Sequence, residues 1–249
     1  MRRIALLGFL AASTPISVPA LRAEGASGVA EADGARVPVV VELFSSEGCS
    51  SCPPADALLA RLDREQPIAG VEVIALEMHV DYWNRLGWTD PFSQAAFTSR
   101  QRMHVFAMNG RSVYTPQMVI DGRDELVGSN AAGATLAIER AGRAPHVSVK
   151  LARQGDEVAI DVGPPPASEG VCHAMLATTE RGLRTRVTAG ENAGEPLAHG
   201  PVVRSLRFVG DLGPRGLSTR VSEPAKSGQR VVVLVESRDS LHVLGAATL

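Results

Sequence analysis

The sequence predicts an α/β domain, with a central mixed sheet and flanking helices, followed by an all-β, sandwich-like C-terminal domain. Three observations lead to this prediction. Residues 37–46, "VPVVVELFSS", are β-branched and apolar, as expected of a strand buried on both faces. Between residues 55 and 62, four apolar residues recur at i, i+3, i+4 and i+7, the spacing of one helical face. From residue 146 onward no helical period is convincing, and short strand-like runs alternate with turn residues.

The other elements of the first domain follow in chain order. Pro53 and Pro54 suit the first turn of the first helix, where backbone N–H groups lack helical partners. Residues 70–80 predict a second strand, and residues 93–110 predict a helix that ends at an Asn-Gly pair. We expect residues 37–144 to form this domain and residues 145–249 the β-rich one.

The last part of the first domain predicts a hairpin and a helix. Residues 112–128 contain two short strands joined at Asp121-Gly122, a strong signal for a tight turn. Ser129 is expected to cap a helix that runs to about Arg143. The predicted order is therefore β-α-β-α-β-β-α.

The N-terminus has the layout of a secretory signal peptide. Residues 1–23 combine a basic start, a short apolar run and small residues, and residues 24–36 are expected to be a flexible lead. The apolar run is too short to span a bilayer, and no other segment is long and apolar enough. The net charge of −2 gives no basic footprint for nucleic acid. We expect a periplasmic or secreted protein without a membrane span, in a compartment where disulfides persist.

Two of the three cysteines, Cys49 and Cys52, lie between the first strand and the first helix. The N-terminus of a helix favours a thiolate, so Cys49 is expected to attack and Cys52 to resolve the mixed disulfide. A permanent structural disulfide is the main alternative. A zinc site commonly needs about four ligands, and beyond this pair only Cys172 and scattered histidines remain, so we expect no metal and no organic cofactor.

The motifs together resemble a known family. "ELFSSEGCSSCPPAD", "HVDYWNRLGW", "VYTPQMVIDGR" and "ENAGEPLAHGPVVR" are similar to the exported, thioredoxin-like family catalogued as domain of unknown function 1223. The resemblance covers residues 37–249 and implies a thioredoxin-like fold without a settled biochemical role. The chain departs from ordinary thioredoxins because Gly48 precedes the first cysteine and two serines separate the pair, which leaves the direction of electron flow open.

The thioredoxin-like resemblance also implies roles for residues around the pair. Thr115 and a cis Pro116 would face the cysteines, with Tyr114 beside them, and would bind an extended substrate. Glu42 resembles the buried acid that moves the proton of the resolving cysteine, and burial would raise its pKa. A solvated or paired glutamate, and a trans proline at a strand edge, are the alternatives.

Further polar residues are expected near the same edge of the sheet. His79, Asp81 and Trp83 follow the second strand, and sites gather at the carboxyl ends of strands. Hydrogen-bonded loop anchoring for Asp81 and packing for Trp83 are the alternatives to substrate binding.

The long polar loop 186–204 carries Glu191, Asn192 and His199, which would either reach the cysteines or pin the loop. The odd cysteine, Cys172, lies in an apolar-leaning strand and is expected to be buried and inert.

The sequence thus predicts an exported thiol–disulfide oxidoreductase that uses the Cys49–Cys52 pair. Its partners would be exported thiol or disulfide proteins, or small thiols, together with a recycling redox partner. The alternative is a non-catalytic binding or structural module in which the disulfide is permanent.

Overall fold

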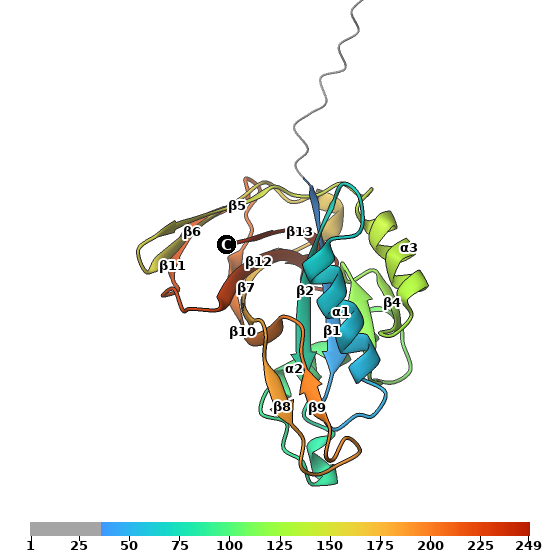
Figure 1. Ribbon diagram of the computed structural model, residues 1–249. Helices are drawn as coiled ribbons and strands as arrows, with labels where there is room; N and C mark the ends of the chain where they lie inside the picture. Colours follow the sequence, from blue (N-terminus) through green and yellow to red (C-terminus); the bar gives the residue numbers. More distant parts are fainter. Residues whose placement is uncertain (1–35) are drawn as a thin grey trace, which may run out of the picture. The chain divides into compact units, whose positions relative to one another are not determined.

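The structure is a computed structural model that describes residues 36–249. The first part of the chain has the predicted order of elements (Figure 1). These elements are β1 (Val37–Ser45), α1 (Pro53–Glu65), β2 (Val71–His79), a short 3-10 helix η1 (Asn84–Leu86), α2 (Ala95–Ala107), β3 (Gln117–Ile120), β4 (Asp124–Val127) and α3 (Ala131–Ala141). The predicted signal peptide 1–23, and the lead up to residue 35, lie outside the described residues.

Local sequence signals explain where several elements begin and turn. Asp121 and Gly122 both have positive φ, 45° and 64°, as the predicted tight turn between β3 and β4 requires. One cap differs from the prediction. The side chain of Asn130, not Ser129, caps α3, because its Oδ1 accepts a hydrogen bond from the Gly133 N–H at 3.0 Å.

The second part of the chain is built from strands. From residue 145 to 249, all of which the structure describes, it contains no α-helix and one 3-10 turn, η2 (Ala167–Glu169). The strands are β5 (Val149–Gln154), β6 (Glu157–Val162), β7 (Cys172–Glu180), β8 (Arg184–Arg186), β9 (Pro196–Ala198), β10 (Val202–Asp211), β11 (Leu217–Ser222), β12 (Gln229–Ser237) and β13 (Val243–Thr248).

The strands of the two parts share one mixed sheet. Its order is β13-β12-β7-β10-β2-β1-β3-β4. The parallel β1–β2 pair lies at the centre, and β10 joins β2 in parallel through Val202 opposite Glu77. The expected separate C-terminal domain is therefore corrected: the segment is β-rich, but the described residues form one compact unit. Strand-like runs predict strands but do not show which neighbours they pair with.

Three apolar layers surround the sheet. On one face of β1 and β2, Val39, Val41 and Leu43 pack against α1 and α3. On the other face, Val40 and Phe44 pack against α2 and strands β7, β10, β12 and β13. A separate three-stranded sheet, β11-β6-β5, covers β7 and β12. Each face of β1 is thus buried, which explains its continuous apolar sequence.

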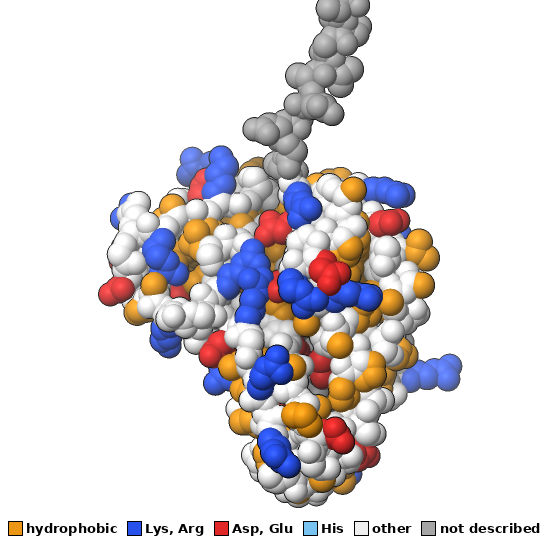
Figure 2. All heavy atoms as spheres, in the orientation of Figure 1, with side chains coloured by type: hydrophobic (Ala, Val, Ile, Leu, Met, Phe, Trp, Pro, Cys, Tyr) orange, Lys and Arg blue, Asp and Glu red, His pale blue; other side chains and the backbone are white. Residues whose placement is uncertain are grey.

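The surface carries mixed charge. Figure 2 shows Lys and Arg side chains spread over the visible face with Asp and Glu side chains between them. Within residues 36–249, none of the helices has the length and apolar character needed to cross a membrane.

Candidate functional site

Cys49 and Cys52 form a disulfide in the turn between β1 and α1. Their Cα atoms are 5.5 Å apart. The turn closes through backbone hydrogen bonds from Cys49 N–H to the Ser46 carbonyl and from Cys52 N–H to the Cys49 carbonyl, both 3.2 Å. Cys52 is the N-cap residue of α1, so the pair lies at the positive end of the helix dipole.

The segment before β3 lies next to the cysteine turn. The Thr115–Pro116 peptide bond is cis, as the resemblance implied. The Ser51 hydroxyl, which is also 3.3 Å from Cys49 Sγ, lies 3.5 Å from the Thr115 carbonyl oxygen. Trp83 Nε1 donates to Thr115 Oγ1 at 2.8 Å. The disulfide and the proline segment therefore face one another, linked through Trp83 and Ser51.

Trp83 also limits the size of the side chain at position 48, the residue before Cys49. A Cβ atom at Gly48 would lie 3.0 Å from the Trp83 Cβ, closer than ordinary contacts. Gly48 thus allows Trp83 to approach the turn closely.

The loop between β8 and β9 covers the disulfide turn. Asn192 Nδ2 donates to the carbonyl oxygens of Glu47 at 2.9 Å and Cys49 at 3.0 Å. Glu191 accepts hydrogen bonds from the Ser50 N–H and hydroxyl. Both cysteines are buried, with 1% of Cys49 and 0% of Cys52 exposed. This loop therefore reaches the cysteine turn and is fixed to it by hydrogen bonds. Glu191 and Asn192 thus meet both alternatives, which were to reach the cysteines or to pin the loop.

Glu42 differs from its expected state. It is fully buried on the face of β1 that packs against α2. Burial would raise the pKa of this carboxyl, but the charges of Arg100 and His104 outweigh burial and lower the pKa well below its usual range. Arg100 Nε donates to Glu42 at 2.5 Å, and the Arg100 guanidinium also pairs with Glu236. The expected rise in pKa is thus wrong, because the sequence does not show which cation meets the strand.

A different buried acid stands close to the cysteines. Asp56 lies one turn after Cys52 on α1, and Ser45 Oγ donates to its carboxylate at 2.5 Å. Burial, together with the negative charge of Glu77, raises the pKa of Asp56 to about 8. Asp56 is therefore a neutral acid at pH 7.

A buried polar cluster lies at the carboxyl ends of β1 and β2. We call it the Glu77 cluster, and its members are Glu47, Glu77, His79, Asp90 and His199. Glu77 Oε1 meets His79 Nε2 at 2.9 Å and His199 Nδ1 at 3.2 Å. The other ring nitrogen of each histidine forms a hydrogen bond to a different carboxylate. His79 Nδ1 lies 2.7 Å from Asp90 Oδ2, and His199 Nε2 lies 3.0 Å from Glu47 Oε1.

Proximity shifts the pKa values within the Glu77 cluster. Burial would lower the pKa of each imidazolium, but the hydrogen-bonded carboxylates outweigh it, raising the pKa of His79 well above its usual value and that of His199 to about 9. Burial would raise the pKa of Glu77, but the two histidines lower it to about 2.

The remaining predicted residues occupy varied positions. His79 is buried in the Glu77 cluster and does not line an open rim. Asp81 accepts from Thr98 Oγ1 at 2.6 Å, the anchoring role named as its alternative. Tyr114 is partly buried, and its hydroxyl donates to Glu125 at 3.3 Å. Cys172 is a free, buried thiol, as predicted.

Sequence reasoning missed Asp56, Glu47 and Asp90. Glu77 was also missed, although it breaks the apolar strand "VIALEMHV" two positions before His79 and so faces the same side. Asp56 and Asp90 carry no comparable signal, because an acid in a helix or loop is ordinarily exposed.

The fold and the site define a mostly β protein, built on a mixed sheet with few helices, with a disulfide at a strand–helix junction. The chain belongs to the family described as "Protein of unknown function (DUF1223)", whose model matches residues 40–236. It is similar to a protein from Agrobacterium tumefaciens solved by X-ray crystallography, at 31% identity and a TM-score of 0.71, covering 86% of this chain and 95% of that one.

A match to the chicken interferon gamma receptor alpha chain has 14% identity and a TM-score of 0.25, covers 53% of this chain and 55% of that one, and carries no argument. The search of curated proteins found no match.

Proposed function

We propose that this chain is an exported, thioredoxin-like thiol–disulfide oxidoreductase in which Cys49 and Cys52 exchange disulfides with exported thiol proteins or small thiols. The observation that carries the proposal is the disulfide at the start of α1, facing the cis Thr115–Pro116 segment. The order β-α-β-α-β-β-α of the surrounding elements is consistent with a thioredoxin-like fold. The disulfide itself supplies the redox chemistry, so the exchange needs no organic cofactor.

The exchange proceeds in two steps from the oxidised protein. A substrate thiolate attacks Cys49 Sγ, the Cys49–Cys52 bond breaks, and Cys52 leaves as a thiolate that the helix N-terminus stabilises. A second substrate thiolate then attacks the mixed disulfide, which forms the substrate disulfide and releases Cys49. The protein is now a dithiol with two more electrons, and an exported redox partner would reoxidise it.

Asp56 is placed to support the first step. Its backbone N–H donates to the Cys52 carbonyl at 3.1 Å, which places Asp56 one helical turn after Cys52, and its side chain is buried. A neutral acid with a pKa of about 8 is suited to protonate the departing Cys52 thiolate. We assign to Asp56 the proton-moving role that the resemblance gave to Glu42.

The burial of both sulfurs favours a second candidate function. With 1% of Cys49 exposed, a substrate reaches the sulfur only when the loop carrying Glu191 and Asn192 moves away. If that loop stays closed, Cys49–Cys52 is a permanent clasp and the protein is a binding or structural module.

The reduction potential of the pair separates the two functions. A potential above about −300 mV, together with mixed disulfides trapped on Cys49 in a Cys52→Ser variant, would support exchange. A potential below about −300 mV, with slow reduction and no trapped species, would support the clasp. A Cys172→Ser variant is the control, because its thiol is buried and separate from the pair.

A further inference from the structure

The Glu77 cluster has a geometry that hydrogen bonding between carboxylates and imidazoles does not by itself require. Two histidine nitrogens from different segments, one on β2 and one in the loop after β9, converge on the same oxygen, Glu77 Oε1. One ligand atom from each of Glu77, His79 and His199 lies within 4.8 Å of the others. The side chains of all three are fully buried.

We propose that Glu77, His79 and His199 bind a divalent transition-metal ion of the zinc class. The ligand atoms would be a Glu77 carboxylate oxygen, His79 Nε2 and His199 Nδ1. Two histidines and one carboxylate are a ligand set that zinc accepts, with a fourth position left for water. This inference does not depend on disulfide exchange by Cys49 and Cys52.

The observed separations already approach those of a metal site. Two ligands about 2.1 Å from a tetrahedral zinc ion lie about 3.4 Å apart. The two nitrogens lie 2.9 and 3.2 Å from Glu77 Oε1, and the imidazole rings stand at 72° with centroids 5.0 Å apart. Each of these two separations is within about half an ångström of that value, and one ligand atom of each residue lies within 4.8 Å of the others.

The outer contacts match those of metal-binding histidines. Such histidines almost always direct their other ring nitrogen to a carboxylate, carbonyl or water, which fixes the tautomer and the ring orientation. Here Asp90 Oδ2 holds His79 Nδ1, and Glu47 Oε1 holds His199 Nε2. Two further hydrogen bonds fix these carboxylates. Trp88 Nε1 donates to Glu47 Oε2, and the Glu47 backbone N–H donates to Asp90 Oδ2.

The surroundings make a cation favourable. Three carboxylates and two imidazoles are buried together, and the ring of Phe92 packs against both histidines, with centroids 5.4 and 5.2 Å away. Burying several ionisable groups is costly unless charge is offset, and a divalent ion would offset the excess of carboxylates.

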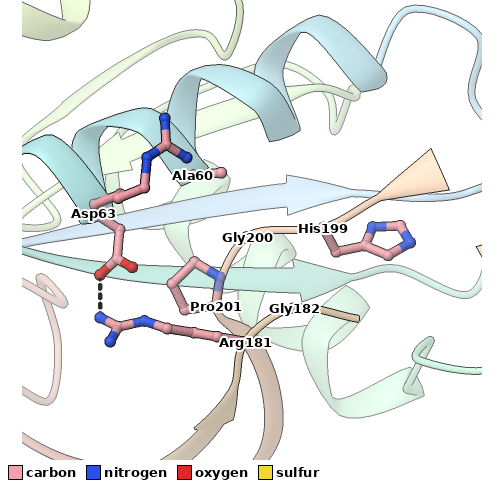
Figure 3. Close-up of a pocket in the computed structure, with 8 residues that line it drawn as sticks. Ala60, Asp63, Arg181, Gly182, His199, Gly200 and Pro201 are labelled. Carbon is pink, nitrogen blue, oxygen red and sulfur yellow. Dashed lines mark hydrogen bonds and ion pairs between the residues drawn. The ribbon is translucent and has the colours of Figure 1, made fainter. Parts of the chain in front are cut away.

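A surface cavity borders the cluster. A cavity of about 390 Å³ reaches His199 and Gly200 from the surface beside Arg181 and Asp63. Figure 3 shows the His199 ring turned away from the Arg181–Asp63 ion pair at one end of this cavity. Glycine is needed at position 200, because a Cβ there would lie 2.8 Å from Glu77 Oε2.

The test uses the full chain without an affinity tag, treated with chelator and kept oxidised so that the Cys49–Cys52 thiols cannot bind metal. Zn²⁺ and Co²⁺ are titrated separately, with elemental analysis after removal of free ion. We expect one ion per chain and a Co²⁺ visible spectrum of a four-coordinate nitrogen–oxygen site. A stoichiometry far below one at saturating Zn²⁺ would overturn the proposal.

Variants assign the ion to these residues. Glu77→Gln and His199→Asn should weaken Zn²⁺ binding by more than about a hundredfold. Glu47→Gln, which changes only an outer contact, should weaken it by about tenfold to a hundredfold. His104→Asn is the matched control, since His104 is equally buried but pairs with Glu42 on the other face of the sheet, and it should bind Zn²⁺ like the wild type. Unchanged binding in folded Glu77→Gln and His199→Asn variants would overturn the assignment.

If those variants do not fold, NMR of the imidazole nitrogens in the wild-type protein identifies the histidines that bind Zn²⁺. Addition of Zn²⁺ should shift His79 Nε2 and His199 Nδ1 and leave the His104 resonances in place. Shifts confined to other histidines would contradict the proposed site.

Discussion

Asp56 makes the chemistry of the cysteine pair testable at a single residue. Because Asp56 is buried one helical turn after Cys52 and its raised pKa favours the protonated acid, Asp56→Asn should slow reduction of the disulfide by a small dithiol at pH 7 by about a hundredfold, the contribution of a general acid. Stopped-flow reduction followed by tryptophan fluorescence would measure the rate. Asp63→Asn is the control, because Asp63 is on the same helix but pairs with Arg181. Equal rates in the wild type and Asp56→Asn would remove Asp56 from the mechanism.

The same residue predicts a difference in stability that depends on pH. In metal-free protein, the pKa of Asp56 rises from 3.8 to about 8 on folding, so the folded state prefers the protonated acid. The resulting cost to stability is absent below about pH 4 and grows as pH rises toward 8. Asp56→Asn removes the ionising group, so its melting temperature should rise relative to the wild type between pH 4 and pH 8. A constant difference across this range would contradict the raised pKa.

At the scale of one element, the loop between β8 and β9 controls access to the disulfide. Asn192→Ala removes two hydrogen bonds to buried carbonyl oxygens, a local cost of about 1–3 kcal/mol. The disulfide should then be reduced by small thiols about 5- to 100-fold faster. Asn130→Ala, which removes the cap of α3, tests whether general destabilisation has the same effect, and it should leave the reduction rate unchanged. An unchanged rate in Asn192→Ala would mean that the loop does not limit access.

Helix α2 is held to the sheet by a buried ion pair network. Arg100 contacts Glu42 and Glu236, which come from β1 and β12, so it joins the N-terminal and C-terminal parts of the sheet. Arg100→Met leaves both carboxylates buried without their cation and should lower the free energy of unfolding by about 3–5 kcal/mol. Urea denaturation would measure this loss. Arg102→Ala, an exposed position on the same helix, should change stability by less than about 0.5 kcal/mol.

At the scale of the whole molecule, periodicity in the sequence predicted elements far better than it predicted their partners. The continuous β-branched, apolar run of β1 and the helical face of α1 are local patterns, and both predicted the element that the structure contains. The joining of β10 to β2, through Val202 and Glu77, brings together residues more than a hundred positions apart. No local pattern encodes such a pairing, so the second half was expected to form its own domain.

The candidate site shows the same limit. The Cys49–Cys52 motif is local and marked one part of the site. The Glu77 cluster combines residues of β2, of the loops after β1 and β2, and of the loop after β9, and it becomes visible only when the sheet is assembled. Glu42 was placed on the correct strand, yet its pKa depends on Arg100, 58 positions away.

Apart from Asp56 and Asp121, whose raised pKa values favour lower pH, the buried ionisable groups predict that the metal-free protein is most stable between about pH 5 and pH 6.5. On the acidic side, Glu42, Glu77 and Glu236 have lowered pKa values, so the stability they contribute is present above their unfolded value of 4.5 and is lost as pH falls through the lowered pKa of each, about 2 for Glu77. On the alkaline side, His79 and His199 have raised pKa values, so their contribution is present below 6.5 and is lost as pH rises through the raised pKa of each, about 9 for His199.

Urea denaturation from pH 2 to pH 9 in the presence of chelator would measure this profile. Glu42→Gln should flatten the acidic side, because its side chain no longer takes up a proton, while the alkaline side keeps its slope. His199→Asn should do the reverse, provided that it folds. A profile that stays level from pH 6.5 to pH 9 would mean that the two histidines are not charged in the folded protein, and the buried cluster would then be neutral at its imidazoles before any metal ion enters.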